Sequence, residues 1–283
     1  MSAVFMPAFA QDKSSKLFCE MSSKEIEKVI IQYSNRNIKP TDRINELSKY
    51  FLGTPYNLQC TGDGHFAIYE PWPLVNFKET NCMALCEHVL ALSISDSWDN
   101  FFNNLQHIRY RDGLIGIKTR NHYTMADWLP KNSWLLDDVS EKVGGAYTRQ
   151  VTRTISHKDF FAAKGVAGID DILPDRKLTI NYVPLEFVHE VKNRIMTGDI
   201  LVLIIAGEKN IFAAHMLMVA EENGKKVIRE ASTSKMTTFE TDIDEWIKQK
   251  QIKYAKKYLG ISLIRIKSKL NKPGRNIKSW EMR

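Results

Sequence analysis

The hydrophobic spacing changes from helical to extended along the chain, and this order constrains the fold more than any other feature. Ser22 and Glu25 form a capping box ahead of apolar residues spaced three and four apart, which predicts a first helix. Similar spacing predicts further helices that begin at caps, namely Thr41, Thr80 or Asn81, and Asp96 or Ser97. Helices are therefore expected to dominate the chain up to about Ile108, with a loop and edge strand at Phe66–Phe77, where Pro71 and Pro73 interrupt the extended pieces.

From about Tyr147 onward, the apolar residues fall instead in short extended segments. We predict strands at Tyr147–Ile155, Leu178–Val183, Ile200–Ile205, Phe212–Ala220, Lys226–Ala231 and Ile261–Lys267. Asn223-Gly224 lies between two of these segments and is typical of a type I′ hairpin turn. Short helices are expected from Pro184 and from Asp242. Helices followed by antiparallel strands are the pattern of an α+β domain.

The chain has 283 residues and no internal repeat, which predicts one domain over residues 11–268. Residues 109–135 lose the hydrophobic period, so a long inserted loop is expected there, and residues 269–283 form a basic tail. Residues 1–10 are apolar and end in Ala8-Phe9-Ala10, which has the shape of a signal-peptidase site. We interpret them as the remnant of an export signal and expect a periplasmic or secreted protein.

The charge balance indicates which partners to expect. Forty Lys and Arg against thirty-three Asp and Glu give a formal charge of +7, which predicts weak attraction to polyanions or simply a solubilising surface. The sequence has no zinc-finger, basic-zipper or RNA-binding signature, so nucleic acid is not an expected partner. No apolar run reaches the roughly 18 residues of a membrane helix, so stable membrane insertion is not expected either.

Cys82 is the best candidate nucleophile among the four cysteines. It follows the expected cap of the third helix, where unpaired backbone N–H groups and the helix dipole favour a thiolate. Cys86 lies one turn deeper and is expected to be a small buried hydrophobe. Cys19 and Cys60 could form a disulfide in an oxidising compartment, which the spacing leaves open. No Cys-x-x-Cys occurs, and no metal or cofactor is expected.

A nucleophilic cysteine requires a base, and His215 stands out because it lies in an otherwise apolar strand. A turn centred on Asn223-Gly224 pairs residues whose numbers sum to about 446 or 447, which brings Glu230 near His215. The acid could then orient the imidazole as a general base, although a satisfied core histidine is the alternative. Other histidines are expected to be solvated, namely His65, His107, His157 and His189.

Together these features resemble the NlpC-type cell-wall cysteine hydrolases, which have a papain-like fold. The resemblance rests on Gly53-Thr54-Pro55-Tyr56, on Asn81-Cys82 at a helix start, and on a strand His whose hairpin partner ends in Ala231-Ser232. Within that superfamily the chain is most similar to the N-acetylmuramoyl-L-alanine amidase-like family, through Cys82–Leu92, Ile108–Gly113, Arg120–Tyr123, Asp127-Trp128, Gly198–Ile200 and His215. This resemblance implies a fold in which N-terminal helices pack on an antiparallel sheet, with the nucleophile at the start of a helix.

The resemblance also implies a role for each matching position. Cys82 would be the nucleophile, His215 the general base and then acid, and Glu230 the group that orients the imidazole. Tyr56 would pack beside the nucleophile and shape the oxyanion region. The substrate cleft would be lined by Arg109, Arg120, His122, Tyr123 and Trp128. A structural loop held by Arg ion pairs and a Trp plug is the alternative for this last segment.

The implied activity is that of a cysteine amidase, which hydrolyses the bond between N-acetylmuramic acid and L-Ala in peptidoglycan fragments, or muropeptides. Small muropeptides are favoured over the intact polymer. An endopeptidase that cuts within the stem peptide is the alternative enzyme, and a non-catalytic cell-wall binding module is the alternative of another class. The Cys82–His215 pair argues against the binding module, because such a module needs no thiolate. The preferred muropeptide and the oligomeric state stay open.

Overall fold

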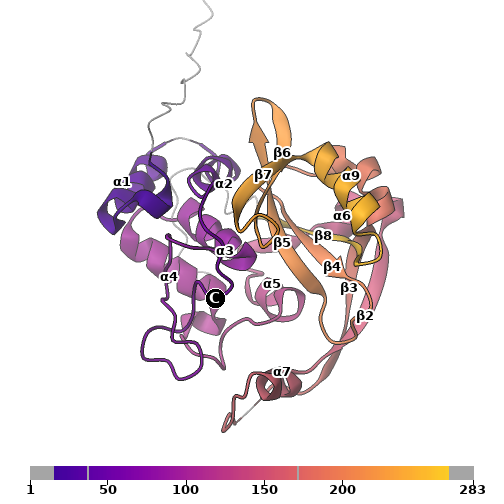
Figure 1. Ribbon diagram of the computed structural model, residues 1–283, viewed down its shortest axis with the longest axis horizontal. Coiled ribbons are helices and arrows are strands. Elements are labelled where there is room, and N and C mark those ends of the chain that lie inside the picture. The colour runs from indigo at the N-terminus through magenta and orange to yellow at the C-terminus, as the bar shows by residue number, and fades with distance from the viewer. Residues whose placement is uncertain (1–15, 37, 171, 268–283) are drawn as a thin grey trace, which may run out of the picture.

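The computed structural model describes residues 16–36, 38–170 and 172–267 (Figure 1). Helices and an antiparallel sheet give the α+β class that the sequence predicts. The expected signal remnant at residues 1–10 and the basic tail at 269–283 lie outside the described residues, and both stay predictions. Across the described residues, no helix has the length and apolar character needed to cross a membrane.

The N-terminal helices are α1 (Ser23–Ser34), α2 (Pro40–Lys49), α3 (Cys82–Ser93) and α4 (Trp98–Arg109). Three of them begin where the sequence predicts, because the side chains of Ser22, Asn81 and Ser97 each accept a backbone N–H of the first turn. The predicted cap at Thr41 is wrong. Helix α2 begins at Pro40, whose missing N–H suits the first helical position.

Shorter helices follow: α5 (Leu129–Lys131), α6 (Ser140–Gly144), α7 (His157–Ala163), α8 (Val188–Val191) and α9 (Ile243–Lys253). Asp242 caps α9 as predicted. Helix α7 was not predicted, although Ser156 followed by Asp159 is a helix-start signal, and Ser156 does cap it. The segment predicted as a long loop contains a π-helical turn, Thr124–Trp128, that leads directly into α5.

The strands are β1 (Leu136–Asp138), β2 (Arg149–Ile155), β3 (Arg176–Pro184), β4 (Ile200–Ile205), β5 (Ala213–Glu222), β6 (Lys225–Ser232), β7 (Thr237–Asp242) and β8 (Tyr258–Ile266). They form one sheet in the order β2-β3-β8-β4-β5-β6-β7, and β1 pairs with β8. The turn between β5 and β6 has positive φ at both Asn223 (51°) and Gly224 (75°), which confirms the type I′ hairpin. The sequence did not predict β1 or β7.

Apolar side chains cover both faces of the sheet. Val202 and Met216 belong to a core that includes the N-terminal helices, whereas Leu203 and Leu217 belong to a second core that includes Trp246 of α9. Figure 1 shows α1 to α4 on one side of the sheet and α9 on the other. Within this arrangement every residue of α3 from Ala84 to Ser93 is buried, so only the start of this helix reaches the surface.

Candidate active site

Cys82 is the first residue of α3 and is partly exposed. The side-chain oxygen of Asn81 accepts the backbone N–H groups of Met83 (3.0 Å) and Ala84 (2.8 Å), which fixes the first turn around the thiol. The positive end of the helix dipole favours a thiolate at this position. Cys86 is fully buried in the apolar core, as predicted. Cys19 and Cys60, which could have formed a disulfide, are free thiols in this structure.

His215 lies on β5, and its Nε2 is 2.8 Å from Oε2 of Glu230 on β6. The predicted hairpin register therefore does bring this acid to this histidine. The β5–β6 ladder ends at the pair Met218–Arg229, although β5 continues to Ala213 beside β4. Strands β5 and β6 are therefore no longer paired at His215 and Glu230. His215 also interacts with the thiol of Cys82. Because Nε2 contacts Glu230, Nδ1 is the ring nitrogen left for the thiol.

Cys82, His215 and Glu230 each shift the pKa of a neighbour toward its charged form. Burial alone would raise the pKa of Cys82, but the charge and hydrogen-bonding capacity of His215 outweigh it, and the Cys82 pKa falls below its ordinary value. Burial lowers the pKa of His215, yet the interactions with Cys82 and Glu230 raise it to about 9. Burial raises the pKa of Glu230, whereas its contact with His215 lowers it overall. The three groups therefore favour a thiolate beside an imidazolium, with a carboxylate behind the ring.

Tyr56 lies near Cys82, and its role in shaping an oxyanion region stays a prediction. It forms a β-bridge with Thr80, which immediately precedes the α3 cap, and its backbone N–H donates to the carbonyl of Met236 at 3.0 Å. Burial raises the pKa of the Tyr56 hydroxyl, and the nearby Cys82 charge raises it further, so the phenol stays protonated. A neutral hydroxyl next to the thiol can donate a hydrogen bond to a reacting group.

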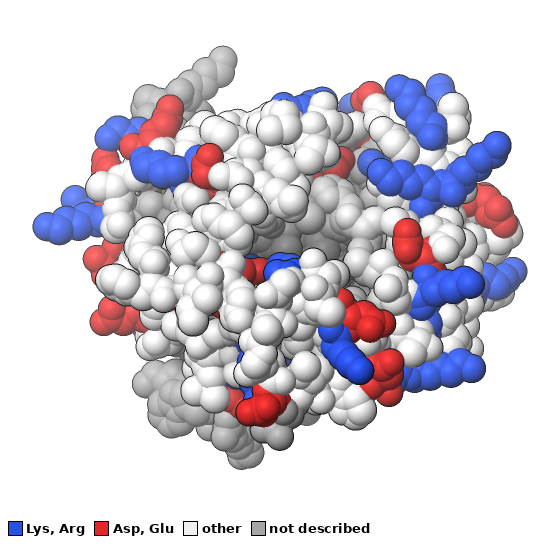
Figure 2. Space-filling model, turned by 60° about the horizontal axis from the view of Figure 1, so that its bottom comes forward, with Lys and Arg blue, Asp and Glu red and all other residues white. Residues whose placement is uncertain are grey.

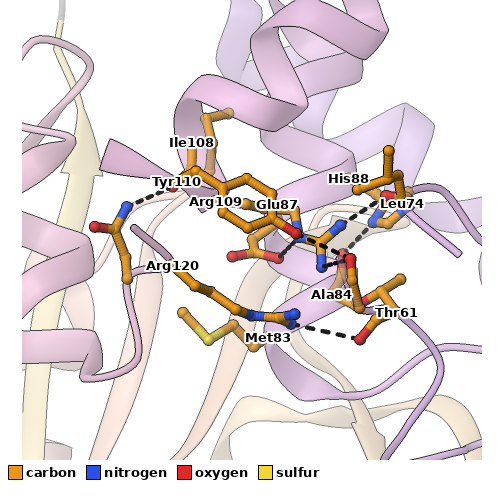
Figure 3. Close-up of polar contacts among 12 residues, drawn as sticks. Thr61, Leu74, Met83, Ala84, Glu87, His88, Ile108, Arg109, Tyr110 and Arg120 are labelled. Carbon is orange, nitrogen blue, oxygen red and sulfur yellow. Dashed lines mark hydrogen bonds and ion pairs between the residues drawn. The ribbon is translucent and has the colours of Figure 1, made fainter. Parts of the chain in front are cut away.

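Two residues expected in the substrate cleft are instead buried supports. Arg109 is 1% exposed and donates to the Leu74 carbonyl at 2.6 Å, while its Nε lies 3.4 Å from a Glu87 carboxylate oxygen of α3 (Figure 3). Trp128 is 0% exposed. The prediction that Arg109 and Trp128 line the cleft is therefore wrong, and the alternative of an Arg-held loop with a Trp plug describes both. Sequence cannot separate these roles, because the same residue types serve in both.

Arg120, His122 and Tyr123 do reach cavities. Arg120 forms ion pairs with Glu70 (2.7 Å) and with Asp63 (3.6 Å) while lining one cavity. His122 and Tyr123 line a second cavity, which also includes Ala213 at the start of β5, the strand that carries His215. Burial lowers the pKa of His122 to about 4, so its imidazole is neutral near pH 7. That these three residues line the substrate cleft stays a prediction.

A second histidine–carboxylate pair was not predicted. His157 is 5% exposed rather than solvated, and its Nε2 lies 2.8 Å from Oδ2 of Asp127. The other oxygen of Asp127 accepts from Arg176 at 2.6 Å. The expectation of a solvated histidine is thus wrong here, whereas His65 and His189 are exposed as expected. The helix-start signal at Ser156 could have located His157 at the first position of a helix.

The described residues contain no group of three or more His, Cys, Asp or Glu side chains arranged to hold a metal ion. The site described above brings together a thiol, an imidazole and a carboxylate. A thiol beside an imidazole that also contacts a carboxylate is an arrangement suited to acyl transfer.

Comparisons with known proteins show the family of this chain. A model of the AmiA-like family, described as N-acetylmuramoyl-L-alanine amidase-like, matches residues 46–254. A Legionella pneumophila protein structure superposes with a TM-score of 0.73 at 19% identity, covering 86% of this chain and 95% of the other. An N-acetylmuramoyl-L-alanine amidase from Bacteroides uniformis superposes with a TM-score of 0.64 at 23% identity, covering 81% and 99%. No curated protein matches the chain in sequence.

Proposed function

This chain belongs to the N-acetylmuramoyl-L-alanine amidase-like family, and from that premise we propose that it is a cysteine amidase of papain-like fold that cleaves the bond between N-acetylmuramic acid and L-Ala in muropeptides. The observation that carries the proposal is the 2.8 Å contact between His215 and Glu230, on the histidine that interacts with Cys82. The similarity to the Bacteroides uniformis amidase supports the fold and, at the level of family, the peptidoglycan-related substrate.

In the proposed reaction the Cys82 thiolate attacks the lactyl carbonyl carbon of the muramic acid. The carbonyl π electrons move to oxygen, and a tetrahedral oxyanion forms. His215 as imidazolium then donates its Nδ1 proton to the amine of L-Ala, and the C–N bond breaks to leave a thioester. A water molecule gives its proton to the now neutral His215 and attacks the thioester. Collapse of this second intermediate releases the muramic carboxylic acid, which loses its proton to solvent, and regenerates the thiolate and the imidazolium.

The oxyanion requires hydrogen-bond donors close to the thiol. The backbone N–H of Cys82 is available, because the first residues of an α-helix have no intrahelical acceptor for their N–H groups. The Asn81 side chain already engages the next two N–H groups. The neutral hydroxyl of Tyr56 is the second donor in this proposal, since it lies near Cys82 and remains protonated.

Products of defined muropeptides, identified by mass, test the proposal. The amidase should release a stem peptide with L-Ala at its amino end, and Cys82→Ala should release none. Cleavage that leaves L-Ala attached to muramic acid would show a stem-peptide endopeptidase instead. Unchanged substrate with the wild-type protein, together with measurable binding, would show a cell-wall binding module. Cys86→Ala is the matched control, because Cys86 is a fully buried cysteine one turn deeper in the same helix.

A further inference from the structure

A cavity separate from Cys82 lies where the segment after α4 meets α5 and α7. Its lining includes Arg111, Lys118, Arg120, Lys131, His157 and Phe161. Figure 2 turns the α7 end of the molecule forward and shows basic and acidic side chains interspersed on this face, which is hollowed near its centre. The proposed reaction uses none of these residues, so the cavity needs an explanation of its own.

The cavity carries an excess of positive charge. Asp127 is the acid of its lining, and that carboxylate is already paired with Arg176 and His157. Within the described part of the chain, neither Arg111 nor Lys131 forms an ion pair, so their charges remain available to a ligand. Arg120 contributes less, because Glu70 and Asp63 already balance it. A ligand that enters this cavity is therefore expected to carry a negative charge.

His157 provides an independent sign that something binds here. The side chain is buried, and Nε2 contacts Asp127, but Nδ1 has no hydrogen-bond partner among the described residues. Buried polar atoms are nearly always paired in folded proteins, so an orphan atom beside a cavity points to a ligand or water that completes it. A neutral ring would accept an N–H at Nδ1, whereas a protonated ring would donate to an anion. The carboxyl-terminal part of a peptide offers both a backbone N–H donor and a carboxylate acceptor.

The remaining walls fit a peptide better than an inorganic anion. Phe161 and Leu173 form an apolar side that could contact an aliphatic side chain. The ring of Tyr123 packs edge-on against the ring of His157, with centroids 5.2 Å apart. Tyr123 also lines the second cavity, which includes Ala213 of β5. This residue therefore links the basic cavity to the strand that carries His215.

From this geometry we propose that the cavity binds a carboxylate on the peptide side of the substrate, with Lys131 and Arg111 as the charge partners and His157 Nδ1 as the hydrogen-bonding partner. This inference rests on the proposed function, because it takes the stem peptide as the source of the carboxylate. A separate free peptide is the other source with the same chemistry, and the experiment distinguishes the two.

The test uses the full chain carrying Cys82→Ala, so that no turnover occurs, and measures binding by calorimetry. The ligands are N-acetylmuramoyl-L-Ala-D-Glu, the same compound with both carboxylates amidated, the free dipeptide L-Ala-D-Glu, and inorganic phosphate. Adding Lys131→Met should weaken binding of the acid about tenfold, as expected for loss of one charge-assisted hydrogen bond, and leave the amide unchanged. Arg111→Gln should act in the same direction, and Lys248→Met on α9 is the matched control.

Equal weakening of acid and amide would overturn the carboxylate assignment, and so would phosphate binding tighter than the acid muropeptide. If the free dipeptide binds as well as the muropeptide, and Lys131→Met weakens binding of the dipeptide but not of the muropeptide, the site serves a separate peptide, and the assignment to the substrate is wrong. Failure of the proposed function would appear differently, as unchanged substrate masses with the active protein. Binding to Cys82→Ala would still report on this cavity in that case.

Discussion

The pairs His215–Glu230 and His157–Asp127 have the same nitrogen-to-oxygen distance, 2.8 Å, and both are largely buried. They differ in what lies around them. The Cys82 thiol raises the pKa of His215, whereas the Nδ1 of His157 lacks a partner among the described residues. Asp127 also pairs with Arg176, and the described ion pairs of Glu230 include His215 alone.

From this difference we infer that a histidine–carboxylate contact does not by itself make a base. The proton on His215 is held by two anionic partners, Glu230 and the Cys82 thiolate, and this raises its pKa to about 9. Asp127 shares its charge between His157 and Arg176, so less of it acts on the imidazole. We therefore expect the first pair to control the reaction rate and the second to control stability and binding. The following experiments separate these effects.

Removal of the thiol should have the largest effect. We expect Cys82→Ala to abolish muropeptide hydrolysis while leaving the circular dichroism spectrum and the melting temperature nearly unchanged, because Cys82 is at the partly exposed start of α3. Iodoacetamide should label Cys82 first, and the loss of activity should follow the labelling. Activity that survives in Cys82→Ala but is lost in Cys86→Ala would reverse the assignment of the nucleophile.

Glu230→Gln should have the next largest effect. A carboxamide cannot stabilise the imidazolium as a carboxylate does, so we expect kcat to fall by about 10- to 1000-fold, on the order of 1.4 to 4 kcal/mol of barrier. KM should change much less. Steady-state kinetics with a single muropeptide measure both constants. A loss of less than threefold would mean that Glu230 only pairs with the histidine and does not assist the reaction.

The pH profile tests the ion pair directly. Activity requires a deprotonated Cys82, whose pKa is lowered, and a protonated His215, whose pKa is raised to about 9. Activity should therefore persist into mildly acid solution and fall about tenfold per pH unit above pH 9. Glu230→Gln should move the alkaline limb to lower pH, because the carboxylate contact helps to raise the pKa of His215. An alkaline limb that does not move would exclude Glu230 from this role.

Asp127→Asn should affect stability more than rate. The change leaves Arg176 and His157 without their shared anion, and we expect the free energy of unfolding at pH 7 to fall by about 1 to 3 kcal/mol. Burial raises the Asp127 pKa, but His157 and Arg176 outweigh it, so the folded pKa lies below the ordinary value. The stabilisation is therefore present near neutral pH and lost as the pH falls through the folded pKa. Urea denaturation of the wild type and of Asp127→Asn should show a smaller difference in the free energy of unfolding in acid than at pH 7.

The sequence predicts one of the two pairs because of a local rule. His215 and Glu230 lie on strands joined by a two-residue turn, so the register follows from the turn itself. His157 and Asp127 are 30 residues apart, and their contact depends on how α7 packs beside the π-helical turn. Hydrophobic periodicity carries no information about such packing. For the same reason it could not show that Arg109 and Trp128 are buried.

The fold shows the same contrast between features that local sequence determines and features that depend on pairing with distant segments. The limits of β4, Ile200–Ile205, agree with the predicted strand because this apolar segment is continuous. Strand β7, Thr237–Asp242, was missed because five of its six residues are polar, and its pairing with β6 identifies it as a strand. The cap at Asn81 was predicted because capping is a local interaction between a side chain and the next turn.

The smallest expected effect compares the two helix starts that carry these sites. Asn81 caps the helix that begins at Cys82, and Ser156 caps the helix that begins at His157. Asn81→Ala and Ser156→Ala should each lower the free energy of unfolding by about 1 kcal/mol, the usual cost of losing a side-chain cap.

Only Asn81→Ala should slow alkylation of Cys82 by iodoacetamide, and by less than about tenfold, because a frayed first turn holds the thiol less well against His215. Faster alkylation in Asn81→Ala would instead mean that the N–H groups of Met83 and Ala84, once released from the Asn81 oxygen, stabilise the thiolate more than the cap positions it. Ser156→Ala controls for a general loss of stability, since its helix start does not contact the thiol. An equal slowing in both variants would therefore show that alkylation follows overall stability, and that the Asn81 cap has no specific part in presenting the nucleophile.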